Sequence, residues 1–305
     1  MTYHKILVPL DGTAVARWVL SRSERLLAQP SAEVRLLAVV EATGAQASDP
    51  LYLADPRHKT VHDDLASLKA SLLARGIATD AEVRFGDPAT EILREAATGG
   101  FDLVTMATHG RTGLGRLLFG SVALKILQAC PIPMLLFRPL LRYDDSLSPV
   151  ERTDPAKFQR VLVPLDGSPV AEEIVPALER LARTFLAGLH LLTVVPGGAE
   201  ESAHRRDAED YLARWTRIFS SIGIDATTEV RAGEAAVETL DCVRERGLDA
   251  IAMTTHGRSG LNRAVYGSVA EKILSQSEVP LLVVRSRVAL PRPLELTDPG
   301  RKLRV

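Results

Sequence analysis

Short apolar segments alternate with amphipathic stretches along the chain, and this alternation predicts its secondary structure. Lys5–Leu10 reads as a short buried strand, and Thr13 can cap the helix that follows, in which apolar residues recur near helical spacing. The same pattern predicts strands at Val34–Val40, Ala81–Phe85, Phe101–Met106 and Met134–Arg138, and helices at Val61–Arg75, at Pro88–Ala97 and from Ser121 to a stop before Pro131. Because strands alternate with helices and most strands are apolar throughout, we expect an α/β fold with a parallel sheet covered on both faces.

The second half of the chain repeats the order of the first. KILVPLDGT at Lys5 returns as RVLVPLDGS at Arg160, and MATHGRTGLGRLLFGSVALKIL at Met106 returns as MTTHGRSGLNRAVYGSVAEKIL at Met253. The first pair is offset by 166 − 11 = 155 residues, measured at the aspartates, and the second by 253 − 106 = 147, so the first half carries about eight extra residues. We place them in a polar loop at Glu41–Lys59, where added length costs little. The chain therefore reads as a tandem duplication of one domain.

Each half contains five predicted strands, which suits a doubly wound sheet. We expect domains at residues 1–140 and 159–286, joined by a polar linker at 141–158 and followed by a tail at 287–305 that has no core of its own. In doubly wound sheets, ligands bind beyond the carboxyl ends of the strands, where the winding direction reverses. If the first and fourth strands of a half are neighbours, Asp11 and the segment from Ala107 to Ser121 face one crevice.

The segment between Ala107 and Ser121 is the strongest candidate for a ligand site. It holds four glycines together with Arg111 and Arg116, and it leads into a helix for which Ser121 fits the N-cap position. A glycine-rich loop delivered to a helix start suits a phosphate, because the first-turn amides are free and carry partial positive charge. The alternative is a structural turn without a ligand, since such turns before helices are common.

Composition narrows the partners that we expect. The 305 residues are 46% hydrophobic and 25% charged, with a formal net charge of −1, which gives no electrostatic reason to expect nucleic acid or an anionic membrane. No run approaches the ~18 apolar residues of a membrane-spanning helix, and the N-terminus has no leader-like pattern, so the cytoplasm is the expected location. Cys130 and Cys242 fall at non-equivalent places of the repeat without CxxC spacing, so we expect free thiols in a reducing compartment.

The repeated motifs resemble the universal stress protein family, and the whole chain resembles its tandem form over about residues 3–138 and 159–285. Nucleotide-binding members of that family carry Gly, two residues, Gly, nine residues, Gly, and then Ser or Thr. This chain matches all but the first glycine of the signature, with Gly110, Gly120 and Ser121 in one copy and Gly257, Gly267 and Ser268 in the other.

The resemblance implies a fold, a ligand and a role. The fold is two adenine nucleotide alpha hydrolase-like domains that pair through their last strands, Met134–Arg138 and Leu281–Arg285, and further pairing into a homodimer is expected. The ligand is ATP, and the role is that of a nucleotide-dependent stress-response regulator or interaction module. In the family, the aspartate reaches the nucleoside, a valine offers its backbone to the adenine, and the glycine loop with its serine holds the phosphates. Residue by residue, the resemblance assigns nucleotide contacts to Pro9, Leu10, Asp11, Val39, Met106, Ala107, Gly110, Arg111, Gly120, Ser121 and Val122, and to Pro164, Leu165, Asp166, Val194, Met253, Thr254, Gly257, Arg258, Gly267, Ser268 and Val269.

Both copies depart from the signature at its first glycine. Ala107 stands there in the first half and Thr254 in the second. Alanine adds one methyl group, whereas threonine adds a branched and stiff side chain, so we expect the N-terminal site to bind better than the C-terminal site. The departures also leave open a second function, an interaction protein whose loops bind no nucleotide.

Two residue pairs have structural interpretations beside the functional ones. Asp11 and Asp166 can be turn residues, since Asp-Gly is a common turn pair, although their recurrence at strand ends favours nucleotide contact. His109 and His256 have no second ligand at usable spacing, so we interpret them as loop residues and assign no metal site.

The chain lacks the motifs of several enzyme classes. It contains no GxxxxGK[ST], HxGH, SGGxxS or GxSxG motif, and no paired carboxylates are evident beside the glycine loop. Any Mg²⁺ is therefore expected to rest mainly on phosphate and water. We assign no catalytic residue and expect at most slow ATP hydrolysis, because no general base is evident. Met106 and Met253 are most simply core residues at a strand end.

Overall fold

A computed structural model of the chain describes residues 2–47, 49–53, 55–108, 120–139, 155–198, 201–255 and 267–286. The first half contains β1 (Lys5–Leu10), α1 (Ala14–Arg22), α2 (Glu24–Leu27), β2 (Glu33–Glu41), α3 (Gly44–Ala47), α4 (Pro50–Leu53), the 3-10 turn η1 (Pro56–His58), α5 (Lys59–Ala74), β3 (Ala78–Gly86), α6 (Pro88–Thr98), β4 (Leu103–Ala107), α7 (Ser121–Ala129) and β5 (Met134–Phe137). The second half contains β6 (Arg160–Pro164), α8 (Pro169–Glu172), α9 (Val175–Phe185), β7 (Gly188–Val195), α10 (Glu201–Ser221), β8 (Ala226–Ala232), α11 (Ala235–Arg246), β9 (Ala250–Thr254), α12 (Ser268–Gln276) and β10 (Leu281–Val284). The predicted strands of the first half are all present, with ends that differ by a few residues.

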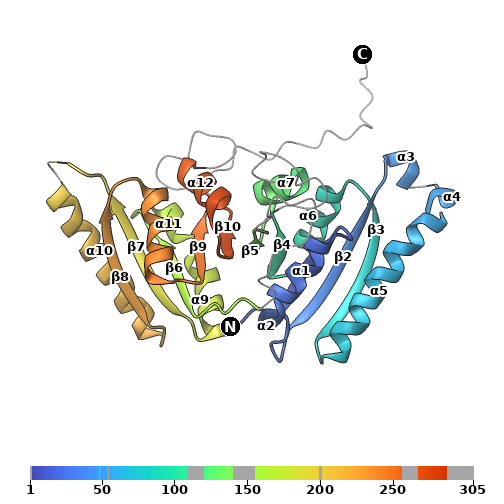
Figure 1. Ribbon diagram of the computed structural model, residues 1–305, viewed down its shortest axis with the longest axis horizontal. Helices are drawn as coiled ribbons and strands as arrows, with labels where there is room; N and C mark the ends of the chain where they lie inside the picture. Colours follow the sequence, from blue (N-terminus) through green and yellow to red (C-terminus); the bar gives the residue numbers. More distant parts are fainter. Residues whose placement is uncertain are drawn as a thin grey trace, which may run out of the picture.

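The ten strands form one continuous sheet in the order β3-β2-β1-β4-β5-β10-β9-β6-β7-β8. Within each half the paired strands run parallel, which confirms the doubly wound prediction. The expected pairing of the last strands is also present: β5 and β10 run antiparallel, with Leu135 opposite Leu282. Figure 1 shows these two strands side by side at the centre of the molecule, with β3 and β8 toward its two ends.

Both faces of the sheet are covered because successive strand residues point to opposite sides. Ile6 and Val8 belong to a core that includes residues of α1, α5, α9 and α10. Leu7, between them, belongs to a second core that includes residues of α6, α7, α11 and α12. Each core contains residues of both halves, so the two halves share their apolar interior as well as their sheet. None of the helices in the described ranges is both long enough and apolar enough to cross a bilayer.

The junction between the halves is also tied by residues outside the strands. Tyr3 is fully buried and its hydroxyl donates to the carbonyl of Ala177 in α9, at 2.9 Å. Phe158, which the sequence places in the linker, is also fully buried, and its ring lies 4.8 Å from that of Phe185. Two residues at the described end of the predicted linker, Ala156 and Phe158, therefore pack into the shared core.

Two stretches differ from the sequence prediction. The sequence predicts a loop at Glu41–Lys59, but the region contains α3, α4 and η1. Figure 1 shows α3 and α4 at one end of the sheet. The first helix is interrupted at Ser23, which separates α1 from α2. Ser23 is fully buried and its hydroxyl lies 3.1 Å from that of Thr105 in β4, so a buried hydrogen bond accompanies the break.

Candidate functional site

The aspartate that follows β1 forms a tight turn at the carboxyl edge of the sheet. Asp11 Oδ1 accepts hydrogen bonds from the backbone N and the Oγ1 of Thr13, at 3.0 and 2.6 Å. Gly12 between them has φ +78°, a conformation that favours glycine. Thr13 Oγ1 in turn accepts from Ala16 N at 3.2 Å, which confirms Thr13 as the cap of α1. No described residue donates to Asp11 Oδ2, so this oxygen is available to a ligand.

The second half repeats this turn. Asp166 Oδ1 accepts from the backbone N and the Oγ of Ser168, at 2.9 and 2.6 Å, and Gly167 has φ +79°. Ser168 caps α8, with Pro169 in the first turn as the sequence predicts. The two interpretations of the aspartates are therefore compatible, because one carboxylate oxygen shapes the turn while the turn sits at the edge where ligands of such sheets bind.

β1 and β4 are neighbours, so the aspartate turn and the start of the glycine loop lie at the same edge. Leu10 pairs with Ala38, and these residues directly precede Asp11 and Val39. Strand order reverses between β1 and β4, which is the switch point predicted for ligand binding.

The base of each glycine loop is closed by the same two backbone hydrogen bonds. Thr108 N donates to Phe137 O at 2.9 Å, and Gly120 N donates back to Thr108 O at 3.0 Å. In the second half, Thr255 N donates to Val284 O at 3.0 Å, and Gly267 N donates to Thr255 O at 3.1 Å. The two ends of each loop are thus held together beside the last strand of its half.

The helix that follows the loop has a glycine at its N-cap, which corrects the sequence prediction. Gly120 caps α7 and Gly267 caps α12, in both cases without a side-chain hydrogen bond, while Ser121 and Ser268 are the first helical residues. Both serines are exposed. A glycine cap has no side chain that could bond to the first-turn amides, so these amides and the serine hydroxyl offer donors together.

An ion pair joins α7 to the neighbouring helix. Lys125 Nζ lies 3.4 Å from Asp87 Oδ2, and the other oxygen of Asp87 caps α6. The second half has the same arrangement, with Lys272 Nζ 2.7 Å from Glu234 Oε1. The start of each candidate phosphate-binding helix is therefore oriented by a second helix.

The remaining predicted residues are buried, partly buried, exposed or outside the described part of the chain. The side chains of Leu10, Met106, Leu165, Met253 and Thr254 are buried, which confirms the core interpretation of the two methionines and restricts any contact at these positions largely to the backbone. Those of Pro9, Val39, Ala107, Val122, Pro164 and Val194 are partly buried, and Val269 is exposed. Gly110, Arg111, Gly257 and Arg258 lie outside the described residues, as do His109, Arg116 and His256.

The extra segment of the first half places aromatic rings at the carboxyl ends of β2 and β3. Tyr52 of α4 donates to Glu41 O at 3.0 Å, and its ring lies 4.9 Å from that of His58. The His58 ring lies 5.1 Å from Phe85, near the end of β3. His58 is buried, and its Nδ1 has no hydrogen-bond partner within the described chain. In the second half, α10 begins soon after β7, so the two sites differ at this end.

Two other features lie away from this edge. A cavity of about 220 Å³, lined in part by Lys5, Arg35 and Phe101, lies at the amino ends of the strands, opposite the predicted site. Cys130 and Cys242 are free and buried, which confirms the free-thiol prediction. Burial raises the pKa of both thiols to about 11, so neither is a reactive thiolate at neutral pH.

Sequence reasoning missed one group of donor side chains. His190, Glu229 and Cys242 lie far apart in the sequence but come together in the second half. A residue-by-residue comparison of the two repeats is the signal that could have found them, because the first half carries different residues at two of these positions.

Comparison with known proteins identifies the family of this chain. The sequence model of the universal stress protein family matches residues 2–138 and 157–285. A universal stress protein of Mycolicibacterium smegmatis is 23% identical over 306 residues, covering 94% of this chain and 98% of its own. One from Methanocaldococcus jannaschii is 26% identical over 151 residues, covering 46% of this chain and 89% of its own. The crystal structure of a universal stress protein from Archaeoglobus fulgidus superposes with a TM-score of 0.70 at 21% identity, covering 93% of this chain and 99% of that one. The chain therefore belongs to the universal stress protein family and carries two copies of its domain.

Proposed function

We propose that this protein binds adenine nucleotide at the carboxyl edge of each half and that occupancy regulates its interaction with another protein. The observation that carries the proposal is the repetition of two features in both halves: a helix start capped by glycine, and an aspartate turn after the first strand of the half. The first element provides donors for phosphate, and the second provides a carboxylate for a ribose hydroxyl.

At the part of each proposed site that would hold the phosphates, the hydrogen-bond donors are backbone amides. Gly120 has φ −65° and ψ 149°, an ordinary extended conformation, so glycine is not needed there for the backbone. What glycine provides is the absence of a side chain over the first-turn amides of α7. Gly267, with φ −69° and ψ 144°, does the same for α12. Nucleotide phosphates, which carry several negative charges, are the ligand class that this arrangement favours.

The residues that would contact the nucleoside favour tighter binding in the first half than in the second. Asp11 Oδ2 is available there, and Tyr52, His58 and Phe85 form an aromatic cluster at the end of the neighbouring strands. We therefore keep the expectation that the N-terminal site binds more tightly than the site beside Thr254.

The test is native mass spectrometry of the purified protein, followed by titration with ATP and Mg²⁺. Wild type is compared with the Gly120→Val, Gly267→Val double variant, in which a side chain covers the amides without straining the backbone. Gly188→Val is the matched control, because Gly188 lies at the amino end of β7 and the nearest atom to an added Cβ is 3.9 Å away. We expect ATP binding by wild type and control and its loss in the double variant. At 100 times Kd, ATP stabilises a single-site protein by about 2.7 kcal/mol, so thermal unfolding provides a second readout.

Absence of ATP binding by the wild type refutes the proposal. That result favours the second function, an interaction protein without nucleotide, which the replacement of the first signature glycine by Ala107 and Thr254 supports. Release of phosphate that stops in Asp11→Ala indicates instead a slow ATPase.

A further inference from the structure

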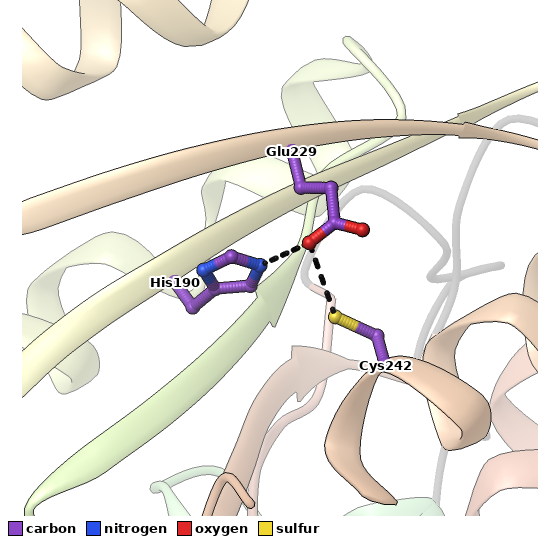
Figure 2. A group of neighbouring side chains, drawn as sticks. All are labelled: His190, Glu229 and Cys242. Carbon is purple, nitrogen blue, oxygen red and sulfur yellow. Dashed lines mark hydrogen bonds and ion pairs between the residues drawn. The ribbon is translucent and has the colours of Figure 1, made fainter. Parts of the chain in front are cut away.

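Three potential metal ligands meet between the sheet and α11 in the second half. His190 projects from β7, Glu229 from β8 and Cys242 from α11 (Figure 2). Glu229 Oε2 lies 3.1 Å from His190 Nε2 and 4.0 Å from Cys242 Sγ, and the three ligand atoms lie within 4.8 Å of one another. Two of the residues stand on strands and the third on a long helix, so the group is held by rigid elements.

The duplication identifies the counterparts of these residues in the first half. Leu7 pairs with Arg35 as Leu162 pairs with His190, so Arg35 and His190 occupy equivalent positions. Leu37 pairs with Glu82 as Leu192 pairs with Glu229.

The third ligand is located in the same way. Gly86 and Gly233, with φ +151° and +146°, mark equivalent bends before α6 and α11. Glu95 is 95 − 86 = 9 residues past the first bend, and Cys242 is 242 − 233 = 9 residues past the second. Two of the three positions have therefore changed chemistry between the halves, from Arg to His and from Glu to Cys.

In the first half, a cation lies between the two acids. Arg35 Nη1 is 2.9 Å from Glu82 Oε2 and 3.2 Å from Glu95 Oε1, so its positive charge bridges them. The second half has no arginine at this position, and the shorter His190 and Cys242 direct a nitrogen and a sulfur toward the carboxylate of Glu229. Imidazole nitrogen, thiolate sulfur and carboxylate oxygen are the donor set that Zn²⁺ prefers.

We propose that the second half binds one Zn²⁺ through His190 Nε2, Glu229 Oε2 and Cys242 Sγ, at the place where Arg35 bridges two acids in the first half. Zinc bonds of about 2.0–2.3 Å place neighbouring tetrahedral ligands about 3.3–3.6 Å apart. The observed separations of 3.1 and 4.0 Å need small side-chain adjustments to reach that range, and His190 Nε2 and Cys242 Sγ, which lie within 4.8 Å of each other, reach it by side-chain rotation toward the ion. Water takes the fourth position, and the Cys242 thiol proton passes to solvent when the metal binds.

The residues around the group orient the histidine. Thr227 Oγ1 lies 2.9 Å from His190 Nδ1, which fixes the ring with Nε2 toward Glu229. Metal-bound histidines commonly have such a partner on the second ring nitrogen.

The charges around the group also accommodate the ion. Arg231 Nε bonds Glu229 Oε1 at 2.7 Å, which leaves Oε2 to the metal. Arg246 lies 3.0 Å from Oε2, but its side chain is 56% exposed and can withdraw to solvent. Without Arg246, Arg231 together with Glu229, Glu238 and Glu245 carries 1 − 3 = −2, and Zn²⁺ entering with loss of one thiol proton adds +2 − 1 = +1. The metal therefore reduces the net charge of the cluster to −1 and replaces the charge that Arg246 withdraws.

Cobalt provides the test, because a thiolate bound to Co²⁺ gives a charge-transfer band in the near ultraviolet and tetrahedral Co²⁺ gives strong visible bands. Tag-free, reduced protein is stripped with a chelator, titrated with Co²⁺ and then with Zn²⁺. We expect saturation at one Co²⁺ per chain and loss of both sets of bands when Zn²⁺ displaces it.

Variants assign the site. We expect Cys242→Ser to lose the charge-transfer band and Cys130→Ser, at the other buried thiol, to keep it. The double variant His190→Arg, Cys242→Glu installs the residues of the first half, so we expect it to keep the wild-type circular dichroism and to bind no cobalt. This double variant also decides the matter if Cys242→Ser does not fold.

A wild-type protein without the charge-transfer band overturns the proposal and leaves a closed hydrogen-bonded network around Glu229. A band that persists in Cys242→Ser or in the double variant overturns it as well. Neither outcome depends on ATP, because the cluster uses neither the aspartate turns nor the glycine-capped helices.

Discussion

Glu95 allows a quantitative test of the ion network in the first half. Its side chain is 7% exposed, and its carboxylate bonds Arg35 Nη1 at 3.2 Å and Arg84 Nη2 through the other oxygen. Two charge-assisted hydrogen bonds contribute about 3–6 kcal/mol together, but the cost of burying the carboxylate, which alanine removes, offsets a large part of this gain. Both arginines keep Glu82 as a partner, at 2.9 and 2.6 Å, and both are partly exposed, so neither is left as an unpaired buried charge. We therefore expect Glu95→Ala to lower the free energy of unfolding by about 2 kcal/mol, below the 3–5 kcal/mol of a fully buried pair.

Urea denaturation measures this loss without adding salt that would screen the charges. Asp63→Asn is the control, because the Lys59–Asp63 pair is more than 60% exposed on both sides and its loss should change stability by less than about 0.5 kcal/mol. Glu95→Gln keeps the volume but turns an amide NH₂ toward an arginine, so we expect a loss at least as large as that of alanine. The reasoning is wrong if Glu95→Ala costs no more than the control, or if Glu95→Gln is neutral.

Three further predictions concern the N-cap of α1, the β5–β10 strand pair and stability at low pH. Thr13→Ala removes the bond that Thr13 accepts from Ala16 N, so we expect a loss of about 1 kcal/mol in urea; an unchanged midpoint contradicts the capping role. Leu135→Ala opens a cavity at the fully buried β5–β10 seam, so we expect a loss of about 2–5 kcal/mol and a shift of both tryptophan signals, one from each half; a shift confined to one signal shows that the halves unfold separately. A hydrogen bond from Arg84 is the main cause that lowers the folded-state pKa of Glu82, so its contribution to stability is complete above the unfolded-state pKa near 4.5 and is lost as pH falls through the folded value. We expect the urea midpoint to fall from pH 7 to pH 3, with a smaller fall in Glu82→Gln; equal falls in both proteins argue against this contribution.

The sequence predicts most of the fold because the responsible signals are local. Apolar runs locate the strands, and Thr13 and Ser168 mark helix starts that the structure confirms. The break at Ser23 was not predictable, because its hydroxyl lies against Thr105, which is distant in the sequence. Likewise, the short helices between β2 and α5 hold aromatic contacts to Phe85 on another strand.

The candidate site is predicted less completely. Asp11 and Val39 lie where the motif places them, but the helix cap is Gly120 rather than Ser121. Serine is a strong N-cap former, so local preference favours the wrong residue. Only the backbone geometry shows that the helix begins one residue earlier, at Ser121.

The His190 group depends on contacts between two strands and a helix. No spacing rule for metal ligands reaches across such distances in the sequence, so a motif search does not find it. The internal repeat provides the missing reference, because Arg35 and Glu95 show what the same positions hold when the network is closed by a side-chain cation.

The antiparallel β5–β10 seam has an evolutionary consequence. In a symmetric dimer of one-domain chains, every substitution appears in both partners at once. Here the same two-sided junction lies within a single polypeptide, so either partner can change while the other is retained. The first half can keep Arg35 and Ala107 while the second half carries His190 and Thr254 at the equivalent positions. None of these residues lies in β5 or β10, the strands that join the halves. Because both domains lie in one chain, a substitution in one domain need not appear in the other, so the two domains can specialise.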